Sequence, residues 1–305
     1  MNATQEHRAS VGQDILERLV SANRPAPFGL LQHAAEVLSQ SFAVTDLLVR
    51  GSLARGTADR LSDVDFVVGV CDAHFGEFVK GLDALVIAQL GAIMPGWRDT
   101  IVADMGGLGY VYLVAYQGRL HQLDLYTAPA SAISGIAATT AARELLHRNC
   151  SDGVEIPTND PAVVSPQTVI AAERTQLPTC TQLPVEVLVL GQMIKKRLAR
   201  GETFVAYGEN HMLTVAFRNL IKLALAPTSP FYGWYHLPED VALTPIGRDC
   251  LAELSALVTA PAVPTPQTLT EALHRVVAVA ERAAPQSVET LRTSLDAYRY
   301  YLELP

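Results

Sequence analysis

The sequence predicts an α+β protein: an N-terminal domain with a mixed β-sheet and helices, followed by a C-terminal helical bundle. Short runs rich in valine and leucine, separated by glycine-containing turns, are confined to the first half of the chain. In the second half the apolar residues recur at helical spacing between proline-rich breaks. A chain of 305 residues is long enough for two domains, which we expect at residues 1–155 and 156–305.

In the first half, helical spacing alternates with strand-like runs, and glycine or proline marks most of the changes. The hairpin between the last two strands is predicted from Gly118, which permits a tight turn. The predicted elements in chain order are helices over 12–22 and 28–42, a strand over 45–50, a short helix over 52–58, a strand over 63–70, a helix over 73–93, strands over 100–104, 109–116 and 120–127, and a helix over 131–149.

Asp152-Gly153 and the prolines that follow predict a connection between the domains. Beyond it the strand signal fades and apolar residues follow helical periodicity. The predicted helices cover residues 163–174, 185–200, 211–225, 249–257 and 268–300.

Composition excludes several classes of protein. The chain is 49% hydrophobic and only 18% charged, which is typical of a compact globular protein. Its net charge of -8 disfavours nucleic acid as a partner, because nucleic-acid binding usually needs a basic surface. No apolar run is long enough to cross a bilayer, and the polar N-terminus differs from a signal peptide. Four scattered cysteines fit a reducing compartment, so we expect a cytoplasmic protein.

The most informative segment lies between residues 50 and 66, where a Gly51-Ser52 turn follows a strand and precedes a second strand. The second strand begins with Asp63 and Asp65. Side chains alternate along a strand, so these two carboxylates point to the same face. Asp124, flanked by leucines in a later strand, is placed to join them. The sequence therefore predicts a cluster of three carboxylates beside a glycine turn.

Crowded carboxylates repel one another unless a cation neutralises them. Hard oxygen ligands suit Mg²⁺ that also binds substrate phosphates, so we expect Asp63, Asp65 and Asp124 to bind Mg²⁺. The set is compatible with a two-metal site. Ser52 is expected at a helix N-cap, where backbone N–H groups can hold a phosphate.

The run from Gly51 to Asp59, followed by Ser62-Asp63-Val64-Asp65, resembles the signature of the polymerase-β-type nucleotidyltransferase superfamily. Within it the layout is similar to aminoglycoside and lincosamide adenylyltransferases, which join a catalytic domain to a helical bundle. The resemblance implies that Gly51 and Ser52 grip the nucleotide phosphates, with Arg55 beside them in the nucleotide site. It also implies that Asp63 and Asp65 carry Mg²⁺, whereas Asp124 acts as general base or as a further metal ligand.

Residues 210–218 are similar to a helix whose arginine contacts the triphosphate in aminoglycoside enzymes. The resemblance places Arg218 in the nucleotide site, and Lys222 lies four residues later on the same helical face. A solvated basic edge of an amphipathic helix is the alternative for this pair. The chain departs from these relatives at Ser229-Pro230 and at 234–236, where their Ser-Lys and Ala-x-x-Trp patterns are missing.

The function expected from these features is transfer of AMP from ATP, or of another nucleoside monophosphate, to a small hydroxylated molecule such as an antibiotic. The acidic chain favours a neutral or cationic acceptor. Asp124 is the first candidate for the general base and Glu186 the second. Alternatives with the same site are activation of a carboxylate or phosphonate, modification of a protein, addition of nucleotides to RNA, or nucleotide binding without turnover.

Overall fold

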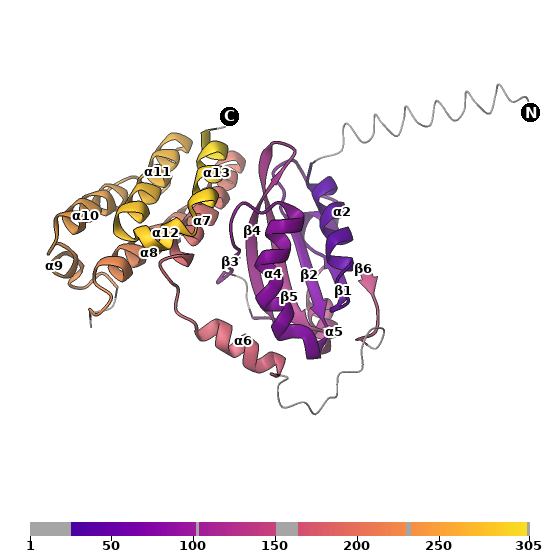
Figure 1. Ribbon diagram of the computed structural model, residues 1–305. Coiled ribbons are helices and arrows are strands. Elements are labelled where there is room, and N and C mark those ends of the chain that lie inside the picture. Colours follow the sequence, from indigo (N-terminus) through magenta and orange to yellow (C-terminus); the bar gives the residue numbers. More distant parts are fainter. Residues whose placement is uncertain (1–25, 102–103, 151–163, 230–232, 304–305) are drawn as a thin grey trace, which may run out of the picture.

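The computed structural model describes residues 26–101, 104–150, 164–229 and 233–303. A six-stranded sheet with helices forms the first half, and a helical bundle lies next to the β3 edge of that sheet (Figure 1). This arrangement confirms the predicted α+β class and the predicted order of the two parts. The helix predicted over 12–22 and the connection around 152–161 lie outside the described residues.

The sheet has the strand order β3-β4-β5-β2-β1-β6. Only β2 and β5 run parallel, and every other neighbouring pair is antiparallel. The elements of this half are α2 (Ala26–Ser39), β1 (Val44–Val49), α3 (Gly51–Arg55), β2 (Val64–Val70), η1 (Asp72–His74), α4 (Phe75–Leu90), β3 (Trp97–Arg98), β4 (Leu108–Tyr116), β5 (Arg119–Pro129), α5 (Ala130–Thr139) and β6 (Arg143–His147).

The two faces of the sheet are covered differently. On one face, alternating residues of β2 and β5 such as Phe66 and Leu125 form a core with α2 and α4. On the other face, α5 covers one part, where Ile133 packs on Val67. Helix α7 (Gln182–Arg200) covers another part, near Val111 of β4. Asp65 and Asp124 alternate with Phe66 and Leu125, so they belong to this second face.

Two predicted elements in this half differ from the structure. The described residues Thr100, Ile101 and Asp104 of the strand predicted over 100–104 are not in a strand, and residues 102–103 lie outside the described part. The strand that pairs with β4 is instead the two-residue β3 at Trp97–Arg98. The carboxylate of Asp99 accepts a hydrogen bond from the backbone N–H of Ile101 at 2.7 Å, and this turn ends the pairing. The helix predicted over 131–149 stops at Thr139, and residues 143–147 pair with β1 as the edge strand β6. Strand pairing at residues 143–147 satisfies the backbone hydrogen-bonding groups on the outer edge of β1. A helix at the same residues would leave those groups of β1 unpaired.

The helical half confirms most of the predicted helices. Its members are α6 (Pro166–Thr175), α7, α8 (Thr203–Leu225), α9 (Leu237–Val241), α10 (Pro245–Val258), α11 (Pro266–Ala283), α12 (Pro285–Glu289) and α13 (Arg292–Glu303). The predicted helix over 268–300 is broken at Ala284, which has a non-helical backbone because proline follows it. The short helix α9 has no counterpart in the prediction.

One hydrophobic cluster joins the two halves. Trp97 and Val111 from the sheet pack in the same cluster as Val187 and Leu190 of α7. Helix α6 follows the predicted boundary in the chain, yet its Ile170 packs in the core beneath α4. The sheet and the bundle therefore have a shared interior, and α6 belongs by its packing to the sheet side.

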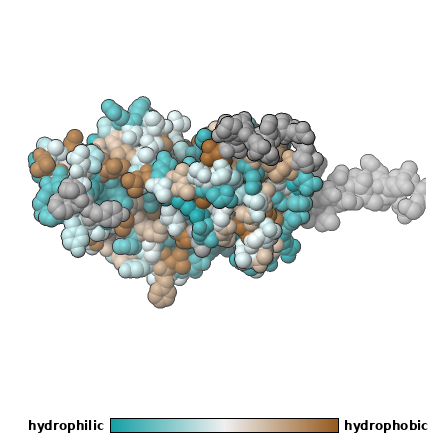
Figure 2. Space-filling view, turned by 90° about the horizontal axis from the view of Figure 1, so that it is seen from below, coloured by the Kyte–Doolittle hydropathy of each residue, from teal (hydrophilic) through white to brown (hydrophobic). Residues whose placement is uncertain are grey.

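Hydrophobic and hydrophilic residues are interspersed over the face seen in Figure 2. None of the helices in the described parts of the chain is both long and apolar enough to cross a membrane. All four cysteines are described, and each is a free thiol.

An ion pair ties the edge strand β6 to β1. His147 Nδ1 lies 2.7 Å from Asp46 Oδ1, and the hydroxyl of Thr45 donates to Asp46 Oδ2 at 2.7 Å. The hydrogen bond to Asp46 and the negative charge of that carboxylate raise the pKa of His147 above its ordinary value of 6.5. The imidazolium form is therefore favoured by folding.

We expect this pair to make stability depend on pH in one direction. Because the pKa of His147 is raised in the folded state, the contribution of the His147–Asp46 pair to the free energy of unfolding is complete below about pH 6.5. This contribution is lost as pH rises through the raised pKa. The difference in urea midpoint between wild type and His147→Gln should therefore be largest near pH 6 and should disappear at alkaline pH. A difference that stayed constant with pH would contradict this origin.

Candidate active site

The carboxylates of Asp65 and Asp124 lie side by side on neighbouring strands. The two residues are direct partners in the parallel register of β2 and β5, so their side chains project from the same face. They occupy the stretch of this face between the part covered by α5 and the part covered by α7. The predicted meeting of these two carboxylates is confirmed.

The electrostatics of the pair reflect burial and mutual repulsion. Burial raises the pKa of Asp65, and the negative charge of Asp63 raises it further. Burial, then Asp65 and Asp63, raise the pKa of Asp124 well above its usual range. Folding therefore disfavours ionisation of both carboxylates at once unless a cation neutralises them.

The third carboxylate, Asp63, lies just before β2 and contacts a lysine from the helical half. Lys196 of α7 is 7% exposed, and its Nζ contacts both Asp63 Oδ1 and Gln122 Oε1. The amide of Gln122 then donates to both carboxylate oxygens of Asp124, at 2.8 and 3.0 Å. One ammonium group is thus connected to two of the three carboxylates.

Lys196 and Gln122 are not among the site residues predicted from the sequence. A signal for each was present, because Lys196 interrupts an apolar helical pattern and Gln122 precedes Asp124 by two residues on the same strand face. A second contact between the halves lies nearby, where Arg200 Nη2 donates to Asp59 Oδ1 at 2.7 Å. Helix α7 therefore contributes directly to the region around the carboxylates.

The glycine turn packs closely against Asp65. Gly51 has φ +64°, and a Cβ atom at this position would lie 2.2 Å from Asp65 Oδ2. Only glycine fits here for both reasons. The backbone N–H of Arg50 donates to the carbonyl of Asp65 at 2.9 Å, which anchors the turn to β2.

The prediction that Ser52 is a helix N-cap is wrong, because the cap residue of α3 is Arg50 and Ser52 lies in the first turn. The carbonyl of Ser52 accepts from the N–H of Thr57 at 2.9 Å, which closes the loop after α3. Arg55 is exposed at the end of α3, and its positive charge lowers the pKa of Asp65. Gly51 and Arg55 are thus close enough to Asp65 to affect it, whereas the predicted phosphate-binding role of Ser52 stays a prediction.

Arg218 and Lys222 make their described contacts within the helical half. The buried Arg218 donates to Asn219 Oδ1 at 2.5 and 3.1 Å, and its guanidinium lies 4.8 Å from the ring centre of Trp234. Lys222 Nζ lies 3.8 Å from Asp240 on α9. Their predicted role in nucleotide binding stays a prediction.

The donor chemistry of Asp63, Asp65 and Asp124 fits a hard divalent cation, and the ammonium of Lys196 shows that this region accommodates positive charge. In the conformation described, Asp63 contacts Lys196 and Asp124 is hydrogen-bonded by Gln122. Within the described ranges, no three or more His, Cys, Asp or Glu side chains are arranged so that they could hold a metal ion. Binding of a cation by all three aspartates would therefore require Lys196 to move from Asp63.

Residues 31–89 match a family model described as a nucleotidyltransferase domain. The match runs from α2 to α4 and includes Gly51, Asp63 and Asp65, whereas Asp124 lies beyond it. No curated protein matches the chain. The glycine turn, the paired carboxylates and this match together support the polymerase-β-type superfamily, and the N-terminal part of the chain carries a nucleotidyltransferase domain.

Proposed function

We propose that the protein transfers a nucleoside monophosphate, AMP from ATP, to a hydroxyl group of a small molecule and releases pyrophosphate. The observation that carries this proposal is the register of Asp65 and Asp124, which brings two carboxylates together beside the Gly51 turn. The nucleotidyltransferase domain over residues 31–89 supports the reaction class.

In the proposed reaction the acceptor oxygen attacks the α-phosphorus of the nucleotide. A bond forms between that oxygen and phosphorus, the bond to the β-phosphate oxygen breaks, and pyrophosphate leaves. Asp124 is proposed to accept the proton from the acceptor hydroxyl, which its raised pKa favours. The proton thus moves from the acceptor oxygen to a carboxylate oxygen of Asp124.

The other residues of the site are proposed to position the reactants and to balance charge. Gly51, Ser52 and Arg55 would hold the nucleotide phosphates, and Lys196 would offset negative charge near Asp63. Mg²⁺ held by Asp63 and Asp65 would, when bound, neutralise charge on the phosphate oxygens. The donor set described above supports this assignment. The alternative role for Asp124 is that of a further metal ligand in place of the base.

The proposal is tested by incubating the purified protein with Mg²⁺, ATP and a panel of hydroxylated small molecules, antibiotics included. Pyrophosphate release that depends on one acceptor, together with a product heavier by one AMP group, is the expected result. Mass spectrometry also separates a stable nucleotidyl ester from a mixed anhydride formed by carboxylate activation. Absence of pyrophosphate release with every acceptor and every nucleoside triphosphate would contradict the proposal.

A further inference from the structure

Two cysteines that lie far apart in the sequence come together at one end of the sheet. Cys71 directly follows β2 and is 8% exposed, whereas Cys150 follows β6 and is exposed. The thiol of Cys150 contacts the thiol of Cys71 and the backbone N–H of Asp72. The proposed nucleotidyl transfer uses neither thiol, so this thiol pair is a separate feature of the molecule.

Strand pairing explains why the two cysteines approach one another. Both β2 and β6 run antiparallel to β1, so both end where β1 begins. On one side of β1, the backbone N–H of Cys71 donates to the carbonyl of Ala43 at 2.8 Å. On the other side, the backbone N–H of Arg148 donates to the carbonyl of Thr45 at 2.9 Å. Two further residues of the same pairing would place Cys150 opposite Ala43 as well.

Strand pairing alone would leave the two thiols too far apart, because residues on second-neighbour strands are separated by about 10 Å. A disulfide needs Cα atoms within about 7 Å of each other. The side chain of Arg148 draws the chain inward, because its Nε donates to the carbonyl of Val44 at 2.6 Å and its Nη2 to that of Ser41. These bonds hold the chain after β6 against the turn that precedes β1, where Cys150 contacts Cys71.

We propose that Cys71 and Cys150 form a disulfide when the protein is exposed to an oxidised pool of small-molecule thiols, and that this bond links β6 covalently to the end of β2. Strand β6 lies at an edge of the sheet and its residues are mostly exposed, so its pairing is among the first in the sheet to open. In a reducing compartment the bond forms only while the glutathione pool is oxidised. The inference does not rest on the proposed nucleotidyl transfer.

The reaction is thiol–disulfide exchange, with glutathione disulfide as the oxidant. The exposed thiol of Cys150 loses its proton and attacks one sulfur of glutathione disulfide. A mixed disulfide forms, the original S–S bond breaks, and one glutathione thiolate leaves. The thiolate of Cys71 then attacks the sulfur of Cys150, and the second glutathione thiolate leaves. The two thiol protons end on the two glutathione molecules, which also take up the two electrons that the protein loses.

The surroundings of Cys150 make the first step slow. Although the residue as a whole is exposed, burial of its thiol, then the hydrogen bond to Cys71 and the charges of Cys71 and Asp72, raise the pKa of Cys150 to about 12. A raised pKa leaves little of the reactive thiolate at neutral pH. We therefore expect the thiol pair to resist a brief pulse of oxidant and to respond to sustained exposure.

The test incubates the full-length protein overnight with glutathione disulfide and digests it without reduction for mass spectrometry. The expected product is a pair of peptides joined through Cys71 and Cys150 and lighter than the separate peptides by two hydrogen atoms. The oxidised protein should melt roughly 5 °C above the reduced protein, and dithiothreitol should reverse this shift. Hydrogen exchange of the β6 amides should slow by about tenfold or more, because the cross-link opposes opening of the edge.

Cys150→Ser is the main variant, because the residue is exposed and its replacement leaves the buried Cys71 in place. It should show neither the cross-link nor the melting shift, and Cys71→Ala should behave likewise. Cys180→Ser, which removes a cysteine of the helical half, is the matched control and should oxidise as wild type does. Glutathione retained on Cys150, a disulfide that involves Cys180 or Cys250, or an oxidised protein with unchanged melting temperature and hydrogen exchange would overturn the inference.

Discussion

Asp65→Asn is expected to lower the turnover number for pyrophosphate release by about a thousandfold or more. The substitution removes one of the two paired carboxylates, and charge stabilisation at a phosphoryl centre is worth several kcal/mol. Stability should move in the opposite direction. Because burial and Asp63 raise the pKa of Asp65, its ionised form destabilises the fold, and a neutral amide removes that cost.

Measuring both pyrophosphate release and urea unfolding of the Asp65→Asn variant distinguishes a loss of catalysis from misfolding. The expected pattern is an inactive variant that is at least as stable as wild type at neutral pH without divalent cations. Asp249→Asn, on the exposed face of α10, is the matched control and should change neither quantity. An active Asp65→Asn enzyme would contradict the role of the carboxylate pair.

Lys196→Met is expected to destabilise the protein by roughly 3 kcal/mol in the presence of a chelator, because it removes the ammonium that Asp63 and Gln122 share. This value is at the low end for broken buried pairs, since the side chain of Asp63 keeps 18% exposure. Divalent cations should restore part of the loss, because a ligand that binds only the folded state stabilises it. Mn²⁺ should also bind the variant more tightly, since the ammonium no longer competes for Asp63.

Urea unfolding with and without Mg²⁺, and Mn²⁺ titration followed by electron paramagnetic resonance, measure these two effects. Lys195→Met is a close control, because Lys195 is the neighbouring residue on α7 and is exposed. It should leave stability and Mn²⁺ affinity unchanged. Weaker Mn²⁺ binding in Lys196→Met would show that the lysine does not occupy the position of the cation.

The local features of the site could be predicted because they depend on neighbouring residues. Asp63 and Asp65 share a face because strand side chains alternate, and glycine at position 51 allows a turn with positive φ. Asp124 could be proposed as a site residue from its flanking leucines alone. Its pairing with Asp65 could not be predicted, because the register of two parallel strands depends on the elements between them.

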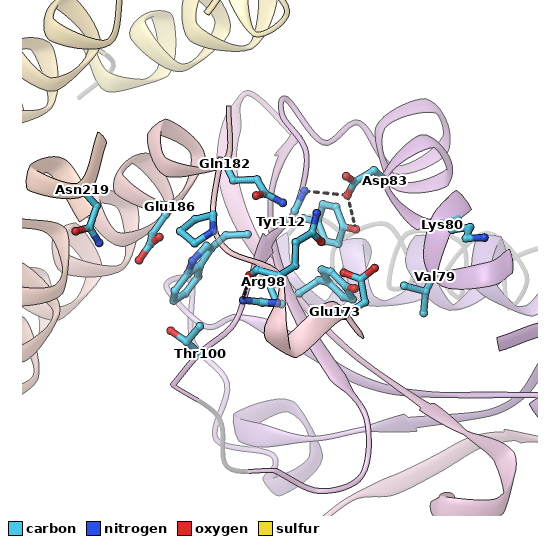
Figure 3. Close-up of a pocket in the computed structure, with 15 residues that line it drawn as sticks. Val79, Lys80, Asp83, Arg98, Thr100, Tyr112, Glu173, Gln182, Glu186 and Asn219 are labelled. Atoms are coloured by element: carbon cyan, nitrogen blue, oxygen red, sulfur yellow. Dashed lines mark hydrogen bonds between the residues drawn. The ribbon is translucent and has the colours of Figure 1, made fainter. Parts of the chain in front are cut away.

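Predictions were wrong where a contact distant in sequence outweighs local preference. Residues 143–147 have a helical pattern, yet they form β6 because β1 offers an unpaired edge. The path of α7 carries Glu186, the second candidate for the base, to the wall of a cavity at the β3 edge (Figure 3), and its role as a base stays a prediction. The same path brings Lys196 to Asp63.

The sequence by itself determined the α+β class, the two-part organisation, and the glycine turn followed by same-face aspartates, because periodicity and turn chemistry act over a few residues. Tertiary structure alone decided that a lysine from the helical half contacts Asp63 and that Glu186 lies in the wall of a cavity at the β3 edge. Those contacts arise from the packing of α7 across the sheet through a shared hydrophobic cluster. The hydrophobic effect is not directional, so an apolar sequence pattern does not say which two segments will pack together. The packing partner of α7 on the sheet is therefore fixed only when the whole chain has folded.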